Sequence, residues 1–169
     1  MKVRNVACVL LASVILQVIL PNVVGLYEAL RIQFALIAVV HFSLHEDWFR
    51  SAMIGVAGGL MVDLFSGGRI GVYALSYAII GMVVGRAQER VFKDNFLAIA
   101  AVIVGASFLS SILVFNVLAL YGIKMDYLGL FAKSVLPSAA ANAIVGCTVF
   151  SISRRIQDAR SRIWRGSHW

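Results

Sequence analysis

Six apolar stretches follow one another along the chain, separated by short breaks of charged or turn-forming residues. The stretches lie near residues 5–20, 30–45, 50–66, 70–86, 96–121 and 126–152. A helix needs about 20 apolar residues to cross a bilayer. The pattern therefore predicts an all-α integral membrane protein with six transmembrane helices in residues 1–153 and a basic cytoplasmic tail in residues 154–169.

Two of the breaks are very short. The segment "HEDWFR" separates the second stretch from the third, and "SGGR" joins the third to the fourth through a glycine turn. We expect the third and fourth stretches to form an antiparallel helical hairpin. The first stretch has the basic start of a signal peptide, but "PNVVGLYE" follows it without an A-x-A-like cleavage site, so we expect a retained span.

Composition supports the membrane interpretation. The chain of 169 residues is 61% hydrophobic and only 14% charged, whereas soluble domains carry about 25% charged residues. Cys8 and Cys147 lie inside apolar stretches and form no C-x-x-C motif, so we interpret them as small buried hydrophobic residues.

The basic residues predict the orientation of the chain, because Lys and Arg gather in cytoplasmic loops. With six spans and a cytoplasmic N-terminus, the cytoplasmic side carries eleven of the 15 basic residues. These are Lys2, Arg4, Arg50, Arg86, Arg90, Lys93, Arg154, Arg155, Arg160, Arg162 and Arg165, and the other four are Arg31, Arg69, Lys124 and Lys133. The net charge of +7 therefore reflects topology in a multi-pass protein with both termini in the cytoplasm, and it does not indicate a nucleic-acid partner.

The tail "SRRIQDARSRIWRGSHW" has Ile156, Ala159 and Ile163 at helical spacing, with arginines between them. We expect a helix on the cytoplasmic membrane surface, bound to anionic lipid and held by Trp164. We favour a topological anchor over the alternative, a docking surface for a cytoplasmic partner.

Small residues form stripes on two neighbouring spans. Gly55, Gly59 and Asp63 are spaced by four, and so are Gly81 and Gly85. Such stripes let helix backbones approach closely in lipid. Packing within the hairpin is the favoured interpretation, and a groove for the helix of another protein is the alternative.

Asp63 is a carboxylate inside an apolar span, about three residues before the glycine turn. A negative charge at a helix C-terminus is unfavourable, and a charge in a membrane is usually paired. Arg69 beyond the turn and Lys133 in the sixth stretch are the candidate partners. We predict that Asp63 acts as an internal clamp that fixes the turn of residues 63–71.

The sixth stretch reads "AKSVLPSAAANAIVGC". Pro137 is expected to kink the helix, and Asn142 is expected to lie buried and to hydrogen-bond a neighbouring span. Ala139, Ala143 and Gly146 form a small-residue face.

Catalytic and metal-binding motifs are absent from the sequence. His41 and His45 are spaced by four, but no H-E-x-x-H motif or third ligand accompanies them, so we interpret them as polar residues at a cytoplasmic end. There is no G-x-S-x-G or Walker A motif. We therefore predict no enzymatic activity, no cofactor and no bound metal.

The segment "GLMVDLFSGGRIGVYALSY" resembles the signature hairpin of the MreD family, the rod-shape-determining membrane proteins of bacteria. The residues that carry the resemblance are Gly59, Leu60, Asp63, Gly67, Gly71 and Tyr73. The segment "LPSAAANAI", with Pro137 and Asn142, is similar to a second stretch typical of the family. One departure is "YEALRIQFAL", where the family often has a proline-containing start to its second span.

The resemblance implies a non-enzymatic scaffold of the cell-elongation machinery in the bacterial inner membrane. Such a protein binds MreC and helps couple MreB filaments to peptidoglycan synthesis by RodA and its penicillin-binding transpeptidase. The resemblance also implies a fold similar to the six-helix S-components of energy-coupling-factor vitamin transporters.

An S-component is therefore the alternative function. Arg69, Tyr73, Lys133 and Asn142 would then line a small pocket for a vitamin. Two features favour the scaffold. Such subunits commonly dock through an A-x-x-x-A face in the first span, but Ala7 and Ala12 are five residues apart, and the outer breaks "SGGR" and "YGIKMD" are short.

Overall fold

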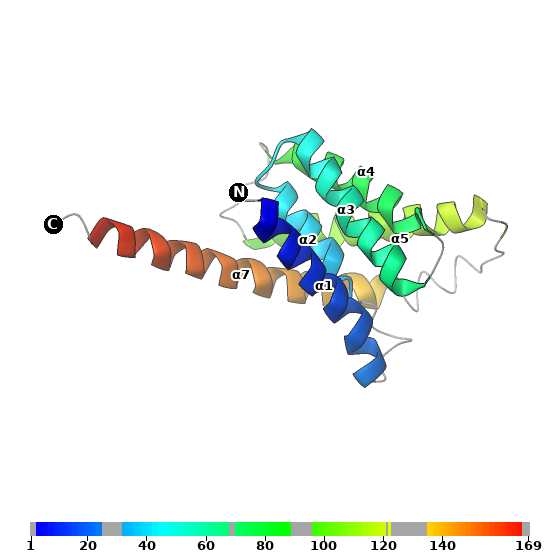
Figure 1. Cartoon of the computed structure of the whole chain (residues 1–169), viewed down its shortest axis with the longest axis horizontal. Coiled ribbons are helices and arrows are strands. Elements are labelled where there is room, and N and C mark those ends of the chain that lie inside the picture. Colours follow the sequence, from blue (N-terminus) through cyan, green and yellow to red (C-terminus); the bar gives the residue numbers. More distant parts are fainter. Residues whose placement is uncertain are drawn as a thin grey trace.

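A computed structural model of the chain describes the backbone at residues 3–24, 32–67, 70–88, 96–120, 122 and 135–166. Side chains are described at 6–19, 32–67, 70–88, 97–117, 119, 120, 122 and 135–155. These residues form helices, with no strand in the described ranges (Figure 1). The helices are α1 (Val3–Val24), α2 (Phe34–Ser43), α3 (Trp48–Ser66), α4 (Val72–Ala87), α5 (Phe96–Leu120) and α7 (Leu136–Gly166).

The helices run alternately up and down. In each of the pairs α1/α2, α3/α4 and α5/α7, residues late in one helix contact residues early in the other, so the two helices are antiparallel. For α1/α2 the contacts are Gln17 with Ala35 and, next to Gly58, Leu10 with Val39. For α3/α4 they are Ser51 with Gly81 and Gly59 with Tyr73. For α5/α7 they are Ile103 with Gly146 and Ser107 with Asn142. This alternation is what a chain that crosses a membrane repeatedly requires.

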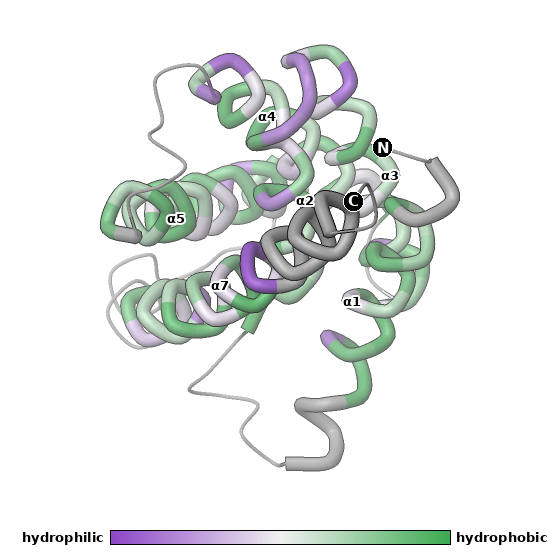
Figure 2. The backbone as a smooth tube through the Cα atoms, turned by 90° about the vertical axis from the view of Figure 1, so that its left-hand side faces the viewer, coloured by the Kyte–Doolittle hydropathy of each residue, from purple (hydrophilic) through white to green (hydrophobic). Residues whose placement is uncertain are grey.

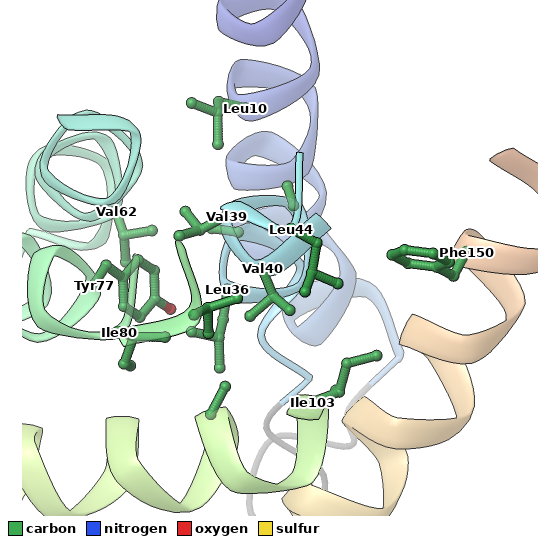
Figure 3. Packing of buried hydrophobic residues seen from close by; sticks show 14 of the residues in the cluster. Leu10, Leu36, Val39, Val40, Leu44, Val62, Tyr77, Ile80, Ile103 and Phe150 are labelled. Atoms are coloured by element: carbon green, nitrogen blue, oxygen red, sulfur yellow. The ribbon is translucent and has the colours of Figure 1, made fainter. Parts of the chain in front are cut away.

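Helix α2 lies at the centre of the bundle, where it packs against α1, α3, α4, α5 and α7. Its sequence "FALIAVVHFS" is apolar on every side, which is typical of a fully enclosed helix. In Figure 3, Leu36 and Val39 of α2 lie beside Tyr77 of α4, a side chain with 0% exposure. Ile103 of α5 and Phe150 of α7 close the other side of the core (Figure 3).

The predicted hairpin of the third and fourth stretches is present, as α3 and α4. The predicted bounds of two other stretches were wrong. The second helix begins at Phe34, after two non-helical residues, and so is much shorter than residues 30–45. The last helix begins at Leu136 and continues to Gly166, through the boundary that we predicted between span and tail.

Helix length limits which segments can cross a bilayer alone. Three helical segments in the described ranges are long and apolar enough: Trp48–Ser66, Leu97–Val117 and Leu136–Arg155. Helix α2 has 10 residues, or roughly 15 Å at 1.5 Å per residue, against a hydrocarbon core of about 30 Å. The chain therefore has the character of a membrane protein, and the number of six spans stays a prediction.

Polar residues gather at one end of the bundle. The C-terminal end of α2 meets α7 there, with the rings of His41 and Phe150 4.9 Å apart. The end of α4 meets the start of α3, where the Arg86 guanidinium lies 5.6 Å from the Trp48 ring centre. Figure 2 looks onto this end and shows hydrophilic positions there, while the helices are mostly hydrophobic along their length.

Candidate functional site

The helices α3 and α4 pack so closely that backbone meets backbone. A Cβ atom on Gly55 would overlap the carbonyl oxygen of Tyr77, and one on Gly59 would overlap that of Tyr73. In the reverse direction, a Cβ on Gly81 of α4 would overlap the carbonyl oxygen of Ser51. Only glycine permits this approach at the three positions, because a side chain would meet atoms that cannot rotate away.

Gly85 completes the contact at the polar end of the hairpin. A Cβ there would lie 2.9 Å from the Cα atom of Trp48 and would also press on the Ser51 side chain. Ser51 is itself fully buried, and its hydroxyl donates to the Glu46 carbonyl oxygen at 3.1 Å. The hairpin glycines therefore lie against protein, and the alternative interpretation of these stripes as an open docking groove does not fit the structure.

Asp63 lies near the C-terminal end of α3 with only 2% of its surface exposed. Its Oδ2 atom accepts hydrogen bonds from the amides of Gly71 at 2.9 Å and Ala74 at 3.1 Å. Its Oδ1 atom accepts one from the amide of Tyr73 at 3.0 Å. These amides belong to the N-cap and first turn of α4, which have no partner inside their own helix. Asp63 thus caps α4 from the neighbouring helix.

This cap explains how a buried carboxylate is tolerated near the end of α3. The end of α3 disfavours a negative charge, but the N-terminus of α4 attracts one. The predicted partners Arg69 and Lys133 lie outside the described residues. In the described residues, Asp63 holds the turn through hydrogen bonds that its carboxylate accepts from backbone amides. The bond from the Gly71 amide joins the two ends of the predicted segment 63–71.

Two glycines shape the turn between the helices. Gly67 ends α3 with φ = 63°, and Gly71 precedes α4 with φ = 104°. Both values lie in the left-handed region, which glycine enters without the steric cost that a Cβ imposes. Tyr73 lies two residues after Gly71 and is half-buried, with its ring 5.7 Å from the ring of Tyr77. The turn thereby presents the first amides of α4 to Asp63.

A second cap from neighbouring helices lies at the start of α2. The Asn142 side chain is fully buried, and its Oδ1 accepts a hydrogen bond from the Gln33 amide at 2.8 Å. Its Nδ2 donates to the Ser107 hydroxyl at 3.1 Å. The prediction that Asn142 is buried and bonds a neighbouring helix is therefore confirmed. Gln17 of α1 adds an Oε1 acceptor for the Ala35 amide at 3.0 Å.

Our reading of the sequence missed Gln17 and Ser107. The available signal for Gln17 was a lone polar residue in the apolar run "VILQVIL", whereas Ser107 is one of several polar residues in its helix and gave no such signal. A lone polar residue in an apolar helix usually faces the interior of a bundle and bonds another helix. The two short helices, α2 and α4, thus share one device: side chains from other helices satisfy the amides that a helix start leaves unpaired.

The predicted kink at Pro137 stays a prediction, because residues 123–134, which precede it, lie outside the described part of the chain. Pro137 is the second residue of α7, and a proline at this position of a helix replaces an amide that has no helical partner. Ala139 and Gly146 of the predicted small-residue face are buried, and a Cβ on Gly146 would press on Ile103 of α5. This face is therefore used for packing within the bundle.

His41 and His45 lie at the end of α2 and just beyond it. The Nδ1 atom of His45 lies 2.9 Å from the His41 carbonyl oxygen, and His41 Nε2 lies 3.4 Å from the Ser153 hydroxyl. Within the described part of the chain, no three His, Cys, Asp or Glu residues form a group that could hold a metal ion. The contact between His41 and Ser153 joins the end of α2 to α7.

Replacing Asn142 by alanine should lower the stability of the fold by about 1–2 kcal/mol, because the Gln33 amide and the Ser107 hydroxyl lose their partner. Asn116 is the matched control, since it is exposed and bonds Ile112 of its own helix. The measurement is the melting temperature of the purified protein in mild detergent. Equal melting temperatures for Asn142→Ala and Asn116→Ala would contradict the capping role.

Comparison with known proteins gives one match. The family model described as rod shape-determining protein MreD matches residues 2–154. No curated protein and no solved structure matches the chain. The matched range includes α1 to α5, the Asp63 cap, the hairpin glycines and the Asn142 cap. Because it covers nearly the whole chain, the protein belongs to the MreD family of rod shape-determining bacterial membrane proteins.

Proposed function

We propose that this protein is a non-enzymatic membrane scaffold of the bacterial cell-elongation machinery. In this proposal it binds MreC and helps couple MreB filaments to peptidoglycan synthesis by RodA and its penicillin-binding transpeptidase. The observation that carries the proposal is the family match over residues 2–154. The geometry agrees with it, because the buried side chains of Asp63 and Asn142 connect helices.

The hairpin supplies a rigid lateral surface for such a partner. Helix α4 packs against the glycine stripe of α3, but another side of α3 is exposed. Four apolar side chains spaced by three or four residues are 39–60% exposed there: Met53, Val56, Leu60 and Leu64. A transmembrane helix could pack on this surface in place of lipid. We therefore propose it as the contact surface for the membrane span of MreC.

We further propose that the protein lies in the inner membrane with both termini in the cytoplasm. The alternating direction of the helices supports an even number of crossings. The polar end of the bundle carries Arg50, Arg86, Arg154 and Arg155, and basic residues favour the cytoplasmic side.

Co-purification tests the proposal. The tagged protein is extracted from its native membranes in mild detergent, and the proteins that accompany it are identified by mass spectrometry. We expect MreC, together with RodA or its transpeptidase. Recovery of a transporter coupling subunit with its ATPases would contradict the scaffold and indicate a vitamin-binding S-component.

A paired substitution tests the proposed contact surface. Leu60→Trp should lower the recovery of MreC at least threefold without changing the melting temperature, because a bulky ring would hold the partner helix away. Ile112→Trp is the control, since Ile112 is comparably exposed on α5. If both variants recover MreC equally, the contact lies elsewhere on the protein.

A further inference from the structure

Helix α7 is longer than a membrane requires. It runs without a break through 31 residues, from Leu136 to Gly166, which is roughly 46 Å at 1.5 Å per residue. The segment that can cross a bilayer ends at Arg155. Residues 156–166 therefore continue the same helix for roughly 16 Å more, and Figure 1 shows α7 extending past the other helices. We call residues 156–166 the α7 arm.

The arm bears on our expectation of a helix that lies flat on the membrane, which stays a prediction. A flat helix would need a sharp bend after the span, and sharp bends need a proline, a glycine pair or a similar defect. Residues 147–165 contain neither proline nor glycine. The arm continues the helix of the span (Figure 1), and Ile163 lies roughly 12 Å along the helix beyond Arg155. The headgroup layer is only about 5–8 Å thick.

An apolar stripe runs along α7 and into the arm. Its positions are spaced alternately by three and four residues, which is the heptad spacing of paired helices: Val149, Ile152, Ile156, Ala159 and Ile163. Within the span, Val149 is 41% exposed and Ile152 is 53% exposed. The neighbouring Phe150 is 5% exposed and packs on the bundle. Val149 and Ile152 therefore lie on a side of α7 that the bundle does not cover.

The positions beside the stripe are basic. In heptad register, the flanking positions are Ser153, Arg155, Arg160 and Arg162. Flanking charges choose the partner of a paired helix, and like charges oppose pairing. Two copies of this arm would bring arginines together, whereas glutamate or aspartate flanks would complement them.

We propose that residues 149–163 of α7 form one half of a helix pair, and that the other half is a helix with an apolar heptad stripe and acidic flanks on a partner protein. The inference does not depend on the scaffold proposal, because it concerns a different surface from the exposed side of α3. It assigns the arm a protein partner in place of lipid.

The test uses the full-length protein in phosphatidylcholine nanodiscs and a synthetic four-heptad peptide with leucine at the stripe positions and glutamate at the flanks. We expect binding that weakens with added salt, because salt screens the attraction between charges of opposite sign. Combined Ile156→Ser and Ile163→Ser should raise the Kd at least tenfold. Ser161→Ala, on the opposite side of the arm, should change the Kd less than twofold. A matched peptide with lysine flanks should not bind.

Three results would overturn the proposal. The first is equal binding of the acidic and basic peptides, and the second is an unchanged Kd for the variant with both serine substitutions. The third result concerns lipid and uses a spin label on Ala159→Cys, in a protein that also carries Cys8→Ala and Cys147→Ala. Oxygen accessibility of a membrane-embedded label, in nanodiscs that contain phosphatidylglycerol, would mean that the arm lies on anionic lipid.

Discussion

Gly59→Ala should separate α3 from α4 and destabilise the fold more strongly than a methyl addition on an open helix surface. The added carbon would overlap the carbonyl group of Tyr73 and lie 2.6 Å from the Cα atom of Ala74. These are backbone atoms, so only a movement of the whole helix relieves the overlap. Overpacking of a well-packed core costs about 1–3 kcal/mol, and we expect the upper part of this range. The readout is the melting temperature in mild detergent.

Gly105→Ala is the matched control for this substitution. Gly105 lies inside α5, and a Cβ there would have no other atom within 4 Å. Alanine is favoured over glycine in a helix by about 1 kcal/mol, so Gly105→Ala should leave the melting temperature equal or slightly higher. If Gly59→Ala and Gly105→Ala give the same melting temperature, Gly59 does not lie against the backbone of α4.

Asp63→Ala is the second substitution with a large expected effect. It leaves the amides of Gly71, Tyr73 and Ala74 without their acceptor. Each buried amide that loses its partner costs about 1–3 kcal/mol. Because the cap lies near the end of the hairpin, where water can approach, we expect a total loss of about 3 kcal/mol. If the scaffold proposal is right, less MreC is also recovered with this variant.

Two further variants separate the cap from a general effect of charge. Asp63→Asn retains one acceptor oxygen, so its loss of stability should lie between those of the wild type and Asp63→Ala. Asp47→Ala removes an exposed carboxylate at the start of α3 that makes no side-chain capping bond. Its melting temperature should match that of the wild type. If Asp47→Ala and Asp63→Ala lower it equally, the backbone hydrogen bonds of Asp63 have no special role.

The hairpin was predictable because its signals are local. The spacing of Gly55, Gly59 and Asp63 by four residues defines one side of a helix, and "SGGR" defines the turn. The sequence also indicated that Asp63 needs a partner. It did not indicate that backbone amides of α4 supply one, since we considered only charged side chains as partners.

The short central helix was not predictable in the same way. Arg31 and Gln33 interrupt the apolar stretch of residues 30–45 just before Phe34, but two polar residues do not by themselves mark the start of a helix. Its start is defined by hydrogen bonds from Gln17 and Asn142, which are far away in the sequence. Whether Pro137 bends the last helix depends on the residues before it, which the described ranges do not include.

The cap on α2 also affects when the protein can finish folding during synthesis. Asn142 follows Gln33 by 109 residues, which a ribosome translating about 5–20 residues per second adds in roughly 5–22 s. The hairpin can assemble early, since Asp63 and Ala74 are 11 residues apart. The Gln33 amide, however, has to wait in the insertion machinery or in lipid until the last helix arrives. Helix α2, the most enclosed helix of the bundle, is thus synthesised early, but its N-terminal cap is completed only after α7 has been made.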